Sequence, residues 1–216
     1  MTNRKSEENY IHVQSLIDDK AVADMREFVE KSGNNPNMVK EFVFFLKKLA
    51  GGHVESCKIK SRRLQMLKQE VESIADFNMF SDEEAVDLVE FLNSEFCHQS
   101  SLDLLNKRNS DKAEVSFVKL QTLMCMNSED ADKYFYEVSS HMKGSANNKE
   151  LVENFFLTWM QAAIMKSDVK LMDDICFKHA SSEYYKPDLT FKCKLLYLKK
   201  ICLTESVDQA YQVLYF

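Results

Sequence analysis

The scarcity of glycine and proline constrains this chain more than any other feature of its sequence. The 216 residues include only four glycines and two prolines, against roughly 7% and 5% in an average protein. Because these residues supply most tight turns, their scarcity disfavours hairpins, barrels and sandwiches. We find no convincing β-strand. We predict an all-α fold, either an irregular helical bundle or a short α-solenoid, with roughly ten to twelve helices.

Residues 35–51 predict a helix with recognisable ends. Asn35 suits the N-cap, and Pro36 suits the first helical position, where a missing N–H costs nothing. We expect Gly51 to end the helix in the left-handed conformation. Apolar residues cover most of the circumference, which is typical of a helix inside a bundle or an interface: Val39, Phe42, Val43, Phe44, Phe45, Leu46 and Leu49.

Other boundaries follow from capping residues. Ser81 to Glu84 reads as a capping box, Ser110 as the N-cap of the following helix, and the pair Asp18-Asp19 as a break or cap within an N-terminal helical pattern. That pattern comprises Tyr10, Val13, Ile17, Val22, Met25, Phe28 and Val29. A long helix with one apolar and one basic face is expected at about 53–77.

Helix starts are predicted near residues 128, 148, 168, 187 and 205. This spacing of about 19 residues fits stacked helix hairpins, and it equally fits helices of similar length in an irregular bundle. No repeated residue signature accompanies it. We expect one helical domain, 1–216, with a subdivision into 1–109 and 110–216 as the alternative. The apolar ending Tyr211 to Phe216 favours the N-terminal part of a longer protein over a C-terminus docked into its own core.

The cysteines and the N-terminus bear on the compartment. Six cysteines lie within helical patterns rather than in a loop-rich scaffold, and the first residues lack the apolar core of a secretory signal. We therefore expect reduced thiols and a cytoplasmic or nuclear protein. No apolar run approaches the roughly 18 residues of a membrane span, so no membrane association is expected.

Charge is distributed unevenly along the chain. The net charge is −6, yet residues 47–68 contain seven basic residues and one acidic residue, a local charge of +6. Within this segment the candidate binding cations are Lys58, Lys60, Arg62, Arg63 and Lys68. They could contact phosphates or an acidic protein, or they could form an ordinary solvated helix face. No stacking aromatics are interleaved with them, as specific RNA binding usually requires.

Catalytic and cofactor motifs are missing from the sequence. It has no glycine-rich phosphate loop and no Cys-x-x-Cys motif. Cys176 and His179 share a helix face at i, i+3, but a metal would need further ligands from elsewhere. We therefore predict no cofactor, no metal site and no enzymatic activity. An enzyme assembled from distant residues is the least favoured of the functions considered.

Aromatic side chains complete the set of candidates. The aromatic runs at 42–45, 134–136 and 155–159 suit a helical core first. Among the aromatic residues, Trp159, Tyr184 and Tyr185 would serve as partner anchors, since Trp and Tyr dominate interface energetics. We predict a non-enzymatic protein–protein interaction module: an adaptor, scaffold or assembly subunit of an intracellular complex. It would bind another protein or form a homodimer. An RNA- or DNA-associated protein using residues 58–68 is the alternative.

Overall fold

The computed structural model describes residues 2–53, 56–108, 110–180, 185 and 187–204, with side chains between residues 8 and 201. Ten α-helices, one 3₁₀-helix and one π-helix occur in these ranges, and no strand is found among them. The all-α prediction is thus confirmed. The helix expected near Glu205 lies outside the described residues.

The chain divides into two compact units, Met1–Ser110 and Asp111–Phe216. The N-terminal unit contains α1 (Thr2–Lys31), α2 (Pro36–Gly51), α3 (Cys57–Ser73), η1 (Phe77–Met79), α4 (Asp82–Ser94) and α5 (His98–Asn106). The C-terminal unit contains α6 (Ala113–Cys125), α7 (Asp130–Gly144), α8 (Lys149–Met165), α9 (Val169–Asp174), the π-helix η2 (Ile175–His179) and α10 (Pro187–Thr204).

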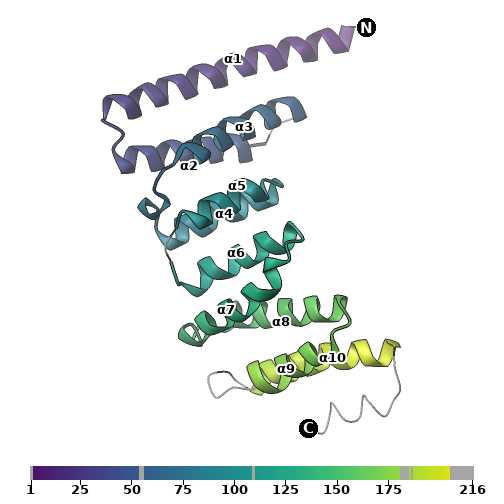
Figure 1. Cartoon of the computed structure of the whole chain (residues 1–216). Coiled ribbons are helices and arrows are strands. Elements are labelled where there is room, and N and C mark those ends of the chain that lie inside the picture. The colour runs from purple at the N-terminus through teal and green to yellow at the C-terminus, as the bar shows by residue number, and fades with distance from the viewer. Residues whose placement is uncertain (1, 54–55, 109, 181–184, 186, 205–216) are drawn as a thin grey trace. The chain divides into compact units, whose positions relative to one another are not determined.

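In the N-terminal unit, α2 and α3 pack closely against each other, and α1 packs mainly against these two helices. Figure 1 shows α2 and α3 on one side of α1. The core of this unit contains Phe42, Leu46, Leu67, Phe77 and Leu88, all fully buried. In the C-terminal unit, α6 pairs with α7, while α8 packs against α9, η2 and α10.

Several predicted helix caps are confirmed. Such caps can be predicted from sequence because they depend on hydrogen bonds between residues close together in the chain. The Asn35 side chain accepts a hydrogen bond from the Asn37 N–H at 3.0 Å, and Pro36 opens α2. Ser81 and Glu84 form the reciprocal capping box of α4. The bond from the Ser81 N–H to the Glu84 carboxylate, 2.7 Å long, lowers the pKa of Glu84. The helix starts predicted near 148 and 168 are also confirmed, and there the side chains of Asn148 and Asp168 cap α8 and α9.

Three local predictions were wrong. Gly51 remains helical and Gly52 is the C-cap in an extended conformation; a Cβ at Gly51 would lie 3.1 Å from the Phe91 ring, so close packing explains this glycine. Ser110 does not cap α6, whose N-cap is Lys112; its hydroxyl donates to Asp82 instead. The pair Asp18-Asp19 does not interrupt α1, which continues to Lys31.

Left-handed residues recur at the ends of helices. Phe96, Asn127 and Ser167 have φ values of 59°, 51° and 54° after α4, α6 and α8. In each turn the next N–H bonds back to a helical carbonyl, as from Cys97 to Leu92 at 2.8 Å, which is the Schellman arrangement. Asn tolerates this conformation, but a phenylalanine in it is strained. Phe96 is nevertheless 84% exposed, so burial does not compensate the strain.

We expect Phe96→Asn to raise the free energy of unfolding by up to about 1 kcal/mol, because Asn adopts the left-handed conformation at lower cost. Urea denaturation of the purified chain measures this change. Phe96→Ala is the matched control, since it removes the same ring and keeps the strain. An equal gain in both variants would contradict the assignment of the strain to the backbone.

Candidate functional site

The basic segment of α3 carries one buried cation, Arg63. Its Nε donates to Asp18 Oδ2 at 2.8 Å and its Nη2 to Asp18 Oδ1 at 3.1 Å. Its Nη1 donates to the Leu49 carbonyl at 3.3 Å. Asp18 is 2% exposed and Arg63 is 9% exposed, so the pair is desolvated. This bidentate pair links α1, α2 and α3, and it explains why α1 continues through Asp18.

Two further cations of the segment have acidic partners. Arg62 Nη2 contacts both carboxylate oxygens of Asp19, at 2.7 and 2.5 Å, and this hydrogen bonding raises the pKa of Arg62. Lys60 Nζ lies 2.7 Å from Glu95 Oε1. Both pairs are partly exposed and thus contribute little to stability. They do neutralise much of the charge that the sequence places on this helix.

Lys58 and Lys68 differ from these three. Lys58 is exposed in the first turn of α3, and Lys68 is half-buried. Lys68 lies close enough to Cys97 to lower the pKa of that thiol, although burial, the larger effect, raises it. Within the described ranges neither lysine forms an ion pair. Of the five predicted binding cations, the structure therefore leaves Lys58 and Lys68 without an ion-pair partner in the described ranges, whereas the other three contact carboxylates.

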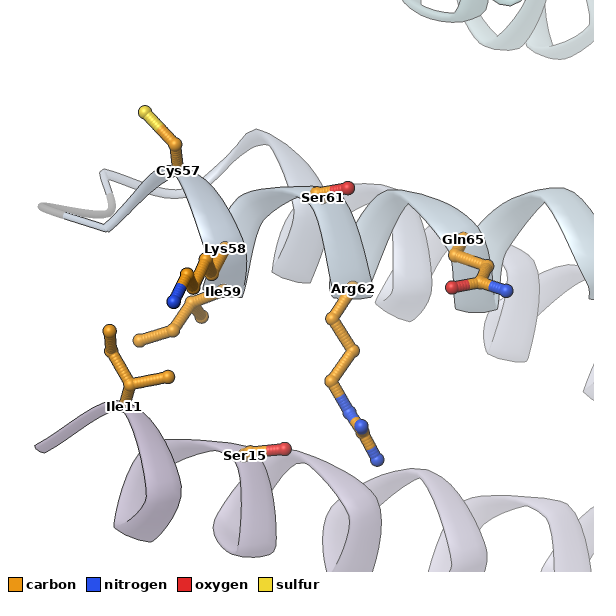
Figure 2. Close-up of a pocket in the computed structure, with 8 residues that line it drawn as sticks. All are labelled: Ile11, Ser15, Cys57, Lys58, Ile59, Ser61, Arg62 and Gln65. Carbon is orange, nitrogen blue, oxygen red and sulfur yellow. The ribbon is translucent and has the colours of Figure 1, made fainter. Parts of the chain in front are cut away.

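A hollow of about 500 Å³ lies between α1 and α3 beside these cations. Its lining consists of Ile11, Ser15, Cys57, Lys58, Ile59, Ser61, Arg62 and Gln65. Figure 2 shows Arg62 reaching toward α1, whereas Cys57 points away from it. Among the described residues that line the hollow there is no histidine and no carboxylate.

The outer side of α1 presents an apolar surface that we call the α1 stripe, formed by Tyr10, Val13, Ile17 and Phe28. Each of these side chains is between 49% and 57% exposed. Residues of the opposite face, including Val22 and Val29, are buried. At 100° per residue, the four stripe positions lie within about 60° of one another, away from the buried face.

The signal for the α1 stripe is present in the sequence, but a single helical periodicity does not resolve it. Tyr10, Val13, Ile17, Val22 and Phe28 all fit one apolar pattern. On a helical projection they fall into two groups, one centred on Val22 and one on Ile17. A 30-residue helix with two apolar faces can pack one face against its own unit, and the other face then remains exposed.

Trp159, predicted as a partner anchor, lies in the core of the C-terminal unit and is 1% exposed. Its ring stacks on Phe135 at a centroid distance of 5.5 Å, and Tyr136 and His179 pack against it at 5.2 and 4.9 Å. Trp159 Nε1 is buried with no hydrogen-bond partner in the described part of the chain. In this conformation the ring organises the core and is not accessible to a partner.

The neighbouring candidates are placed differently. Tyr185 is half-buried, its ring meets Phe156 edge-on at 5.0 Å, and burial raises its pKa to about 12. Tyr184 lies outside the described residues. Cys176 and His179 are both on η2, but Cys176 is fully buried and burial raises its pKa to about 12. Among the described residues, no group of three or more metal-ligating side chains is found.

Within the ranges that the structure describes, no helix has the length and apolar character needed to cross a bilayer.

No protein-family model matches the chain, and no curated protein or solved structure is significantly similar to it. A functional proposal therefore depends on the geometry of the chain itself.

We expect Arg63→Ala to lower the free energy of unfolding by about 3–5 kcal/mol, because it leaves the Asp18 carboxylate buried and unpaired. Urea denaturation measures the loss. Arg62→Ala, one residue away and half-exposed, is the matched control and should cost less than about 1 kcal/mol. The double variant Asp18→Leu/Arg63→Met should recover most of the stability, since it removes both charges. Equal losses for the two single variants would contradict the distinction between these pairs.

His179 should make the stability depend on pH. Burial lowers its pKa below 6.5; Lys143 and Lys178 also lower it, while Asp174 opposes them. Between the lower folded value and 6.5 the unfolded chain binds more protons, so stability declines as the pH falls through this window. Urea denaturation at about pH 7.5 and about pH 5.5 should show a smaller decline for His179→Phe than for the wild type. Identical declines would rule out this histidine as a source.

Proposed function

We propose that this chain is a non-enzymatic protein–protein interaction module, of the adaptor, scaffold or assembly-subunit kind, and that the α1 stripe is its binding surface. The observation that carries the proposal is the half-exposure of four large apolar side chains on one side of a 30-residue helix. Large apolar side chains exposed together on one side of a helix are typical of an interaction site when they form a patch.

The composition of the α1 stripe supports this use. Tyr10 and Phe28 are aromatic, and aromatic residues are enriched at the centres of protein interfaces. Lys20 and Glu27 are exposed to one side of the stripe, and they can supply part of the polar rim that surrounds such a centre. Asp24 lies within the stripe, between Ile17 and Phe28. The buried Asp18–Arg63 pair fixes the helix beneath, so little conformational entropy is lost on binding.

The alternative of nucleic-acid binding through residues 58–68 has less support. Lys60, Arg62 and Arg63 each contact a carboxylate of their own unit. A phosphate would have to displace these carboxylates or rely on Lys58 and Lys68. Affinity for nucleic acid grows with the number of phosphates that the protein neutralises. Two lysines alone would therefore give only weak binding.

Two further features belong to this proposal. Helices α6 and α7, and likewise α8 and α9, are joined by short turns with left-handed residues; this resemblance supports a hairpin repeat of the α-solenoid kind in the C-terminal unit. Five cysteines of the described chain are free. Free thiols suit a reducing compartment, which favours a cytoplasmic or nuclear location.

The proposal is tested by proximity labelling in cells that express the wild type, Ile17→Lys or Leu16→Lys. Leu16 and Ile17 are adjacent and equally exposed, at 55% and 56%, yet they point about 100° apart. We expect Ile17→Lys to lose a set of labelled proteins, or self-labelling of a second tagged copy, that Leu16→Lys retains. Unchanged labelling in Ile17→Lys would contradict the proposed surface.

A further inference from the structure

Two cysteines of the C-terminal unit are buried on neighbouring elements. Cys176 lies on η2 and Cys193 on α10, and both are 0% exposed. Both are free thiols in this structure. Two thiols that lie together differ chemically from other small core residues, because they can be oxidised to a disulfide. The question is therefore whether the packing of η2 against α10 brings these two side chains face to face.

Two contacts determine how η2 and α10 meet. The Thr190 hydroxyl donates a hydrogen bond of 2.9 Å to the carbonyl of Ala180, the residue after η2. Lys194 Nζ lies 4.8 Å from the centre of the Phe177 ring. The later residue on α10 thus meets the earlier residue on η2. The two elements therefore run antiparallel where they touch.

The cysteines occupy this same junction. Cys193 follows Thr190 by three residues and Cys176 precedes Ala180 by four, so each lies about one helical turn from that hydrogen bond and on the same face. In an antiparallel pair these two steps lead in the same direction, and they bring Cys176 opposite Cys193. The electrostatics agree with this placement: burial raises the pKa of Cys176 to about 12, and the nearby Cys193 is the second cause.

From this register we propose that Cys176 and Cys193 form an intramolecular disulfide when the protein meets hydrogen peroxide, and that the bond fixes η2 to α10. The pair is then an oxidation-dependent device in the C-terminal unit, with two thiols under reducing conditions and one disulfide after oxidation. The inference does not depend on the α1 stripe, which belongs to the other unit.

The reaction has two steps, and its atoms balance. The first thiol, as thiolate, attacks hydrogen peroxide; the O–O bond breaks, a sulfenic acid forms, and the released hydroxide takes up the thiol's proton as water. The second sulfur then attacks the sulfenic sulfur, the S–S bond forms, and the S–O bond breaks with loss of a second water. Two thiols are oxidised to a disulfide, and one peroxide is reduced to two waters.

Burial makes this reaction slow. It raises the pKa of both Cys176 and Cys193 to about 12, so little of the reactive thiolate is present at neutral pH. Cys57 and Cys125 are exposed and should react first. The buried pair reacts when the five-residue η2 opens locally and admits peroxide. It therefore responds to sustained oxidation and not to a brief exposure.

Peptide mapping tests the inference. The dilute, folded full chain, with the exposed Cys57 and Cys125 replaced by Ser, is incubated with hydrogen peroxide for several hours, alkylated, digested without reduction and analysed by mass spectrometry. We expect a linked peptide that contains Cys176 and Cys193, about 2 Da lighter than its two free parts. Oxidation of either cysteine without this link, a link to a different cysteine, or no reaction of the pair would overturn the inference.

Thermal unfolding tests whether the bond fixes η2 to α10. A disulfide that closes a short loop restricts the unfolded chain, so we expect peroxide to raise the midpoint by about 5–10 °C. Dithiothreitol should reverse this rise, and Cys193→Ala should abolish it. Cys97→Ala, which removes a buried thiol of the other unit, is the matched control and should keep it. Circular dichroism checks that both variants are helical. An equal rise in Cys193→Ala would overturn the inference.

Discussion

The buried ion pair between Asp18 and Arg63 determines how the N-terminal unit is built. It connects the middle of α1 to α3 and, through the Leu49 carbonyl, to α2. Since neither charge can be left alone in the core without a large cost, the pair fixes the rotation of α1 about its own axis. That rotation directs Val22 and Val29 inward and leaves Tyr10, Val13, Ile17 and Phe28 outward.

Ion pairs with neighbouring helices also change the interpretation of the basic segment, residues 47–68. Residues 47–68 carry a net charge of +6 in the sequence, which suggests a surface for phosphates. In the folded unit, Asp18, Asp19 and Glu95 lie against three of these cations. The basic and acidic segments are far apart in sequence and adjacent in space. Three cations of this segment therefore pair with carboxylates of neighbouring helices and are not free for phosphates.

Sequence reasoning succeeded where the cause is local. The all-α class follows from the scarcity of turn residues, and the caps at Asn35 and Ser81 follow from side chains that bond to nearby N–H groups. It failed at Asp18-Asp19 because the partner of Asp18 is 45 positions away. The core interpretation of the aromatic run at 155–159 holds for Trp159, whereas its use as a partner anchor does not. The packed and exposed faces of α1 could not be separated, because they depend on which helices become neighbours.

Cysteine accessibility along α1 tests the account most directly. Single cysteines at positions 10 to 28, in a chain without its other reactive thiols, are alkylated and their rates are compared. The account predicts fast reaction at the exposed positions 10, 13, 17 and 28 and slow reaction at the buried position 22. Uniform reactivity along the helix would contradict it.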